Sequence, residues 1–173
     1  MRDSALSVAN YFVQKSLDGD KNLKPLKLMK LVYIAHGFML AMLKKSVFDE
    51  RFDHVEAWRL GPVIPSVYHS FKQYKNKPIE EKAVVFRWND DDDDVEFDYP
   101  MLHDNEAKIV CDYVWKRYNE YTDNDLVTLL HKKGTPWQVI YEEGKNNVIP
   151  DPYTAIYYEK VLKSLERLAK QYD

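Results

Sequence analysis

Five histidines and one cysteine are the side chains in this sequence best suited to catalysis or metal binding. The histidines are His36, His54, His69, His103 and His131. No two of them stand at the i, i+4 spacing that places a pair of ligands on one face of a helix. Cys111 is the single cysteine, which excludes an internal disulfide and every zinc motif built on cysteine pairs. It occupies an apolar step of its segment, so we expect a buried thiol.

Phosphate-binding loops and nucleophile elbows are also missing. The glycines stand at positions 19, 37, 61, 134 and 144 and do not cluster, and there is no G-x-S-x-G. The sequence therefore predicts no catalytic residues, no metal site and no cofactor. The weaker alternative is an enzyme whose site combines distant residues, His36 with Tyr33 or His131. A lone histidine in an apolar helix is more commonly a hydrogen-bonded core residue.

The elements that would position these residues are mostly helices, as apolar residues recur at steps of three and four. Helices are expected over 4–17, 25–45, 65–74, 103–121, 123–133 and 152–172. Short β segments are expected at 47–48 and 54–58, forming a ribbon that Gly61-Pro62 ends, and a hairpin should pair 82–88 with 95–99. We predict a mainly α (α+β) fold: one helical domain, residues 1–173, around a central hydrophobic helix with one or two small β ribbons.

Charge divides the chain into unequal halves. Residues 1–88 contain 15 Lys/Arg and 9 Asp/Glu, whereas residues 89–173 contain 10 and 19. Seven acidic residues fall within 89–98, which predicts a solvated loop. The alternatives are a segment that attracts a basic partner or a Ca²⁺ site, although the EF-hand spacing is absent. The apolar run Leu31–Leu43 is too short to span a bilayer, and no secretory signal is visible. A cytoplasmic protein without a membrane segment is expected.

Three motifs carry a family resemblance. LKLMKLVYIAHG (26–37), EAWRLGPVIPSVY (56–68) and LLHKKGTPW (129–137) follow one another in this order. Together they resemble the Panacea domain, a family associated with phages and mobile elements, over residues 6–140. The chain departs from that pattern at Met29 and His36, where glutamine is common. The resemblance implies motif roles for Lys27, Lys30, Trp58, Gly61, Pro62, Pro65, His131, Pro136 and Trp137.

What the Panacea resemblance implies is a mainly helical, non-enzymatic antitoxin. Its partner would be a cognate protein toxin encoded by an adjacent gene, such as an alarmone synthetase-like inhibitor of translation, whose active site it blocks. The first alternative is an adaptor that delivers the toxin to a cellular protease. The second is a nucleic-acid-binding regulator, for which lysines at 21, 24, 27 and 30 argue; no helix-turn-helix or RNA-reading motif accompanies them.

The Gly-Pro corner is expected to turn the chain stiffly into a helix. Gly61 permits a conformation that other residues resist, and Pro65 is preset for a first helical turn. Such a corner would send Val63 and Val67 into the core and present a rim for a partner. In the last helix, Tyr153 and Ile156 lie off the apolar stripe. The candidate partner-binding residues are Tyr33, His36, Arg59, Tyr68, His69, Tyr153, Ile156 and Tyr157.

Overall fold

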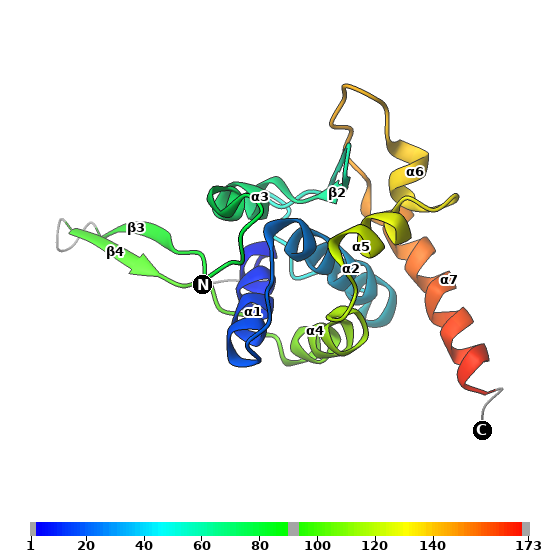
Figure 1. The fold of residues 1–173 in the computed structure, drawn as a ribbon, viewed down its shortest axis with the longest axis horizontal. Coiled ribbons are helices and arrows are strands. Elements are labelled where there is room, and N and C mark those ends of the chain that lie inside the picture. The colour runs from blue at the N-terminus through cyan, green and yellow to red at the C-terminus, as the bar shows by residue number, and fades with distance from the viewer. Residues whose placement is uncertain (1–2, 90–93, 171–173) are drawn as a thin grey trace.

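The computed structural model describes residues 3–89 and 94–170, and α2 (Pro25–Leu43) runs through the middle of the structure (Figure 1). By length and composition alone α2 could cross a membrane, but 72% of its most apolar window is buried inside the protein. Helices α1 (Ala5–Asp18), α4 (Asn105–Tyr118) and α7 (Asp151–Ala169) pack against it. A helix that is apolar on nearly all sides needs such a surrounding layer. The prediction of a central hydrophobic helix is confirmed.

The helix ends follow local capping chemistry. Ser4 and Ser7 form a capping box at the start of α1, and Thr122 and Asp125 form another at the start of α5 (Asp123–Leu130). Helix α2 ends two residues before the predicted position, since Lys44 takes a left-handed conformation with φ of 56°. Helices α4 and α5 are likewise shorter than predicted. Residues 136–140 form a one-turn helix, α6 (Pro136–Ile140), that the sequence did not predict.

The first β ribbon differs from the prediction. Strand β1 (Glu56–Trp58) pairs antiparallel with β2 (Gly61–Val63), so the Gly-Pro corner forms a strand instead of ending one. Residues 47–48 are not in a strand. Pro62 lacks a backbone N–H, but in a two-stranded ribbon it can face away from the ladder. Helix α3 (Pro65–Phe71) and the 3₁₀ turn η1 (Lys72–Tyr74) follow, close to the predicted helix.

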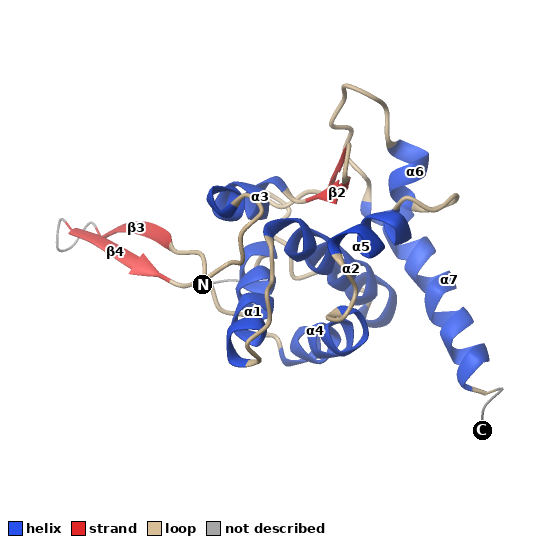
Figure 2. Cartoon of the chain, viewed as in Figure 1, coloured by secondary structure: helices blue, strands red, loops and turns tan. Residues whose placement is uncertain are grey.

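The second ribbon is confirmed. Strand β3 (Val85–Asn89) pairs with β4 (Asp94–Asp98), with Phe86 opposite Phe97. This hairpin projects from the helical body, as Figures 1 and 2 show. Part of the predicted acidic loop, residues 90–93, lies outside the described residues.

One buried apolar cluster draws residues from all seven helices described here, among them Phe12, Phe38, Val67 and Tyr158. Cys111 is buried within it, and burial raises the pKa of its thiol far above the ordinary value. The predicted buried cysteine is confirmed by its burial, and the neutral thiol is its stable form. The mainly α class with two small antiparallel ribbons is confirmed as well.

Candidate functional site

The three sequence motifs meet around the side chain of Lys30. Lys30 is completely buried, and its Nζ donates a hydrogen bond of 2.9 Å to the carbonyl of Pro62. Gly61 has a φ of 106°, and a Cβ atom there would lie 3.0 Å from Lys30 Nζ and 3.4 Å from His131 Nε2. Glycine therefore serves both the backbone conformation and the close approach. We call Lys30, Gly61, Pro62, His131 and Trp137 the motif cluster.

Aromatic stacking holds the third motif in this cluster. The ring centroids of His131 and Trp137 lie 3.6 Å apart, and the two ring planes differ by 4°. Trp137 also stacks on Tyr141, with 4.5 Å between the ring centroids. Trp137 Nε1 donates a 2.7 Å hydrogen bond to the carbonyl of Trp58. Pro136 opens α6 and is buried. Trp137 is buried, and its indole fixes α6 onto the β1–β2 ribbon.

The electrostatics of the cluster follow from its burial. Loss of water lowers the pKa of Lys30 to about 7. Burial, and then the nearby Lys30 charge, lower the pKa of His131, and within 3–89 and 94–170 no hydrogen-bond partner reaches His131 Nε2. An amine of such low pKa can act as a base or nucleophile where substrate reaches it. Lys30 is enclosed and already bonded to Pro62, so it supports the corner.

Groups suited to holding a metal ion are also lacking in the part of the chain that the structure describes: no three His, Cys, Asp or Glu side chains come together for one.

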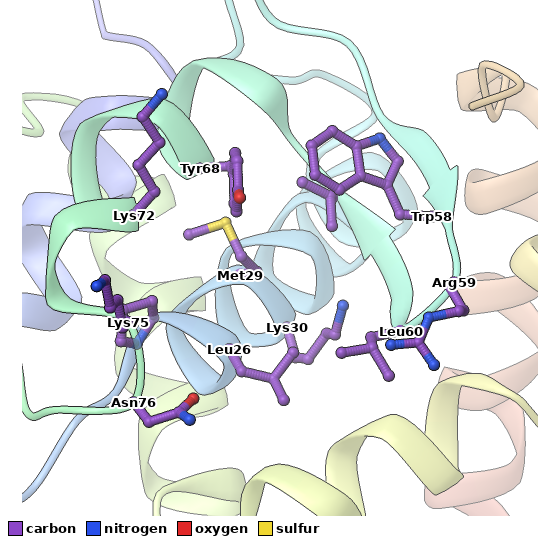
Figure 3. Close-up of a pocket in the computed structure, with 12 residues that line it drawn as sticks. Leu26, Met29, Lys30, Trp58, Arg59, Leu60, Tyr68, Lys72, Lys75 and Asn76 are labelled. Carbon is purple, nitrogen blue, oxygen red and sulfur yellow. The ribbon is translucent and has the colours of Figure 1, made fainter. Parts of the chain in front are cut away.

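A groove of about 430 Å³ opens beside the motif cluster (Figure 3). Its apolar lining includes Leu26, Met29, Trp58, Leu60 and Tyr68. The Trp58 ring meets the Tyr68 ring edge-on at 4.8 Å, and Trp58 Nε1 donates to Glu56 at 2.6 Å. Both rings are therefore fixed before any partner arrives.

Cations lie at the edge of this groove. Arg59, Lys72 and Lys75 are exposed and contribute to its lining. An apolar floor with basic side chains around it suits an acidic segment that carries an apolar anchor.

Tyr33 and His36 lie inside the protein. Each is 1% exposed. His36 bonds Ser46 Oγ at 3.0 Å and Asp151 Oδ1 at 2.8 Å, and it stacks on Phe48 at 4.1 Å. The hydrogen-bonded core role predicted for His36 is confirmed. A partner cannot reach either side chain in this structure, so both are left out of the candidate surface.

The other candidate residues form two groups at the surface. Arg59 and Tyr68 line the groove, and His69 is exposed next to the Tyr68 ring. Tyr153, Ile156 and Tyr157 line a second hollow of about 390 Å³, which Pro136 also borders. Pro136 belongs to the third motif, so the second group adjoins that motif.

Three of the four lysines proposed for nucleic-acid binding are engaged by the protein itself. Lys27 is half-buried, with Nζ bonded to the carbonyl of Asn119 at 2.5 Å, and burial lowers its pKa. Lys30 is enclosed, and Lys21 pairs with Glu120 at 2.9 Å. Three of these lysines therefore hold α2 and the loop before it against the rest of the protein.

Sequence reasoning missed two sets of surface residues. Lys72 and Lys75 of the groove gave no signal, because isolated lysines near a helix end are ordinary. The second set is the hairpin aromatics Phe86, Trp88 and Phe97, each more than half exposed. Their alternation with polar residues was visible, but the same alternation is typical of a buried strand face.

Comparison with known proteins finds a family match and a curated relative. The antitoxin SocA of Caulobacter vibrioides is 29% identical over 136 residues, covering 79% of this chain and 69% of that protein. No solved structure matches. The model of the family described as antitoxin SocA-like, Panacea domain, matches residues 28–138, which include all of the motif cluster. The chain therefore belongs to the SocA-like antitoxin family of Panacea domains.

Proposed function

We propose that this chain is the antitoxin of a toxin–antitoxin pair and neutralises a protein toxin, encoded by an adjacent gene, by covering its active site. Membership of the SocA-like family supports an antitoxin role. The proposed mode of action rests on how the motif residues are engaged. Lys30 and Trp137 are buried and hydrogen-bonded within the protein, so they support the fold. A scaffold of this kind acts through the surface that it holds in place.

The groove beside the corner is the first surface we assign to the toxin. Tyr68 and Trp58 supply stiff aromatic contacts at low entropic cost, and Arg59 supplies a charge at the rim. The second surface comprises Tyr153, Ile156 and Tyr157 on α7. The toxin class that fits the family resemblance is an alarmone synthetase-like inhibitor of translation, acting in the cytoplasm.

Co-expression with the adjacent gene tests this function. Cells expressing the neighbour alone should stop growing, and this chain should restore growth and co-purify with the neighbour. Arg59→Glu combined with Tyr68→Ala should weaken the complex at least tenfold, since central aromatic and arginine contacts dominate interfaces. Gln73→Ala is the matched control, because Gln73 is exposed near α3 but does not line the groove. A harmless neighbour, or no complex with it, would refute the proposal.

The half-life of the toxin separates blocking from delivery to a protease. Blocking predicts the same half-life with and without this chain, together with inhibition of the purified toxin in the absence of any protease. A half-life that falls when this chain is present would favour the adaptor mechanism instead.

A further inference from the structure

The β3–β4 hairpin carries an apolar face that the rest of the described chain leaves open to solvent. Phe86 pairs with Phe97 and Trp88 pairs with Val95, and cross-strand partners point to the same side of a ribbon. Their exposures are 69% for Phe86, 67% for Phe97, 59% for Trp88 and 37% for Val95. In the described structure this face is therefore open to a partner.

A hairpin of this kind is costly unless it binds something. Two strands alone are at best marginally stable in water, and clustered aromatics at a sheet surface favour association. Phe86 and Phe97 meet edge-on at 5.0 Å, which helps to hold the ribbon together without hiding either ring. The exposed face is thus kept in shape instead of collapsing onto the body.

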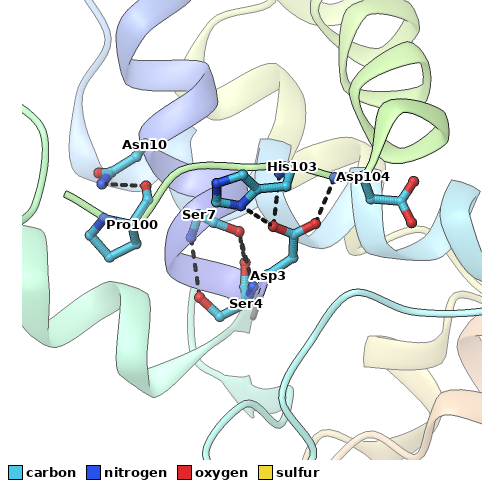
Figure 4. Close-up of polar contacts among 7 residues, drawn as sticks. All are labelled: Asp3, Ser4, Ser7, Asn10, Pro100, His103 and Asp104. Carbon is cyan, nitrogen blue, oxygen red and sulfur yellow. Dashed lines mark hydrogen bonds and ion pairs between the residues drawn. The ribbon is translucent and has the colours of Figure 1, made fainter. Parts of the chain in front are cut away.

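The root of the hairpin is fixed to the body by one buried side chain, Asn10 (Figure 4). Its Nδ2 donates to the carbonyl of Pro100 at 3.0 Å, the bond that Figure 4 draws, and to the carbonyl of Ala83 at 2.9 Å. Its Oδ1 accepts from the N–H of Ala83 at 2.8 Å. Asn10 is 2% exposed. Both ends of the hairpin are therefore tied to α1, and an arm ordered in advance loses less entropy on binding.

Charge limits the kind of surface that this arm can enter. Residues 89–98 contain seven acids, and Arg87 is the only basic residue between 85 and 98. A net acidic segment that also carries exposed aromatics complements a cleft with apolar walls and Lys or Arg side chains. Clefts that hold phosphate-bearing substrates have this composition, since cations bind phosphates and aromatic or apolar walls contact bases.

We infer that the β3–β4 hairpin is the arm by which this chain enters a basic, apolar-walled cleft of its toxin, one built for a phosphate-bearing substrate. The inference rests on the proposed function and deepens it, because occupancy of that cleft excludes the substrate. Three aromatic side chains bury roughly 450 Å² or more, whereas a standard interface takes about 800 Å² from each partner. The arm therefore supplies about half of such an area, and the groove beside the corner supplies more of the contact.

The test is binding of the purified product of the adjacent gene to the full chain. Phe86→Ser combined with Phe97→Ser should weaken the affinity at least about 30-fold, as expected for two central aromatic contacts. Phe52→Ser is the matched control, because Phe52 is 66% exposed but lies outside the hairpin, and its affinity should stay within about threefold of wild type. Unchanged thermal unfolding of both variants would show that neither acts through the fold.

Competition identifies the cleft. Inorganic polyphosphate or ATP should displace the wild-type chain from the toxin, and raising NaCl from about 50 to 500 mM should weaken the complex. Failure of both polyanions to compete would overturn the assignment of a phosphate-binding cleft.

Other outcomes overturn the inference in distinguishable ways. If wild type binds and neutralises the toxin and the hairpin variant does so equally well, the hairpin inference is wrong and the proposed function stands. If the hairpin variant loses only self-association, measured by light scattering of the chain alone, the occupant is a second copy. If wild type does not bind the neighbour at all, the proposed function fails first.

Discussion

Trp137 and Trp88 are the same side chain in opposite surroundings. Trp137 is 8% exposed, lies between two rings and donates its N–H to a backbone carbonyl. Trp88 is 59% exposed on a two-stranded ribbon. In the motif cluster the aromatic surface maintains the shape of the protein, whereas in the hairpin it is available to a partner. The contrast teaches that the most recognisable residues of this chain and its most accessible ones perform different tasks.

The largest difference between the two regions should appear when each tryptophan is replaced with alanine. Trp137→Ala removes two stacking contacts and a hydrogen bond, and should lower the free energy of unfolding by about 3–5 kcal/mol. Trp88→Ala should change it by less than about 0.5 kcal/mol, because the ring is mostly in water already. Urea denaturation measures both. Equal losses for the two variants would abolish the distinction between the regions.

A second comparison uses two glycines of positive φ. Gly61→Ala forces a strained backbone and a tight contact with Lys30, so we expect a loss of roughly 2–4 kcal/mol. Gly134 has a φ of 86° but open space around its Cα, so Gly134→Ala should cost about 1–2 kcal/mol from backbone strain alone. The difference between their unfolding free energies measures how closely the motif cluster is packed; no difference would mean a loose cluster.

The smallest effect of the three is a pH dependence that belongs to Lys30. The folded protein releases the Lys30 proton above about pH 7, whereas the unfolded chain keeps it to about pH 10.4. Unfolding between these values takes up a proton, so the free energy of unfolding should rise with pH. From pH 7 to 9 the rise should be about 2 kcal/mol.

Lys30→Met provides the control for this slope. The variant should lack the rise, as measured by urea denaturation at matched pH values. The raised pKa of the Cys111 thiol makes an opposite contribution, because the unfolded thiol ionises first as pH rises. That contribution is common to both chains and cancels in their difference. Parallel pH profiles for wild type and Lys30→Met would show that Lys30 is not buried as described.

Much of the scaffold could be predicted from the sequence, because helix periodicity and capping are local. Helix α1 is marked by Ser4 at its start, and α2 by Pro25 and its continuous apolar run. The β1–β2 ribbon was mispredicted, since the left-handed region at Gly61 lets Gly61 and Pro62 return alongside Trp58. Propensity alone treats a Gly-Pro pair as the end of a strand.

The candidate site was harder to predict, because it depends on long-range contacts. Nothing near Lys30 in the sequence indicates that its amine reaches the carbonyl of Pro62, 32 positions away. Tyr33 and His36 looked suited to a partner by residue type, but α7 covers that side of α2 through Thr154 and Asp151. The hairpin itself was predictable from its alternation, whereas the lack of a covering layer over Phe86 and Phe97 was not.

Asn10 joins the hairpin to α1 in a way that does not depend on the amino-acid sequence of the hairpin. The three hydrogen bonds at the root involve the backbone of Ala83 and Pro100, and no side chain of β3 or β4 contributes to them. A different ribbon could be joined at the same two points while α1 continued to hold it. Recognition of a new partner therefore requires the exchange of about fifteen residues, with the helical body inherited unchanged.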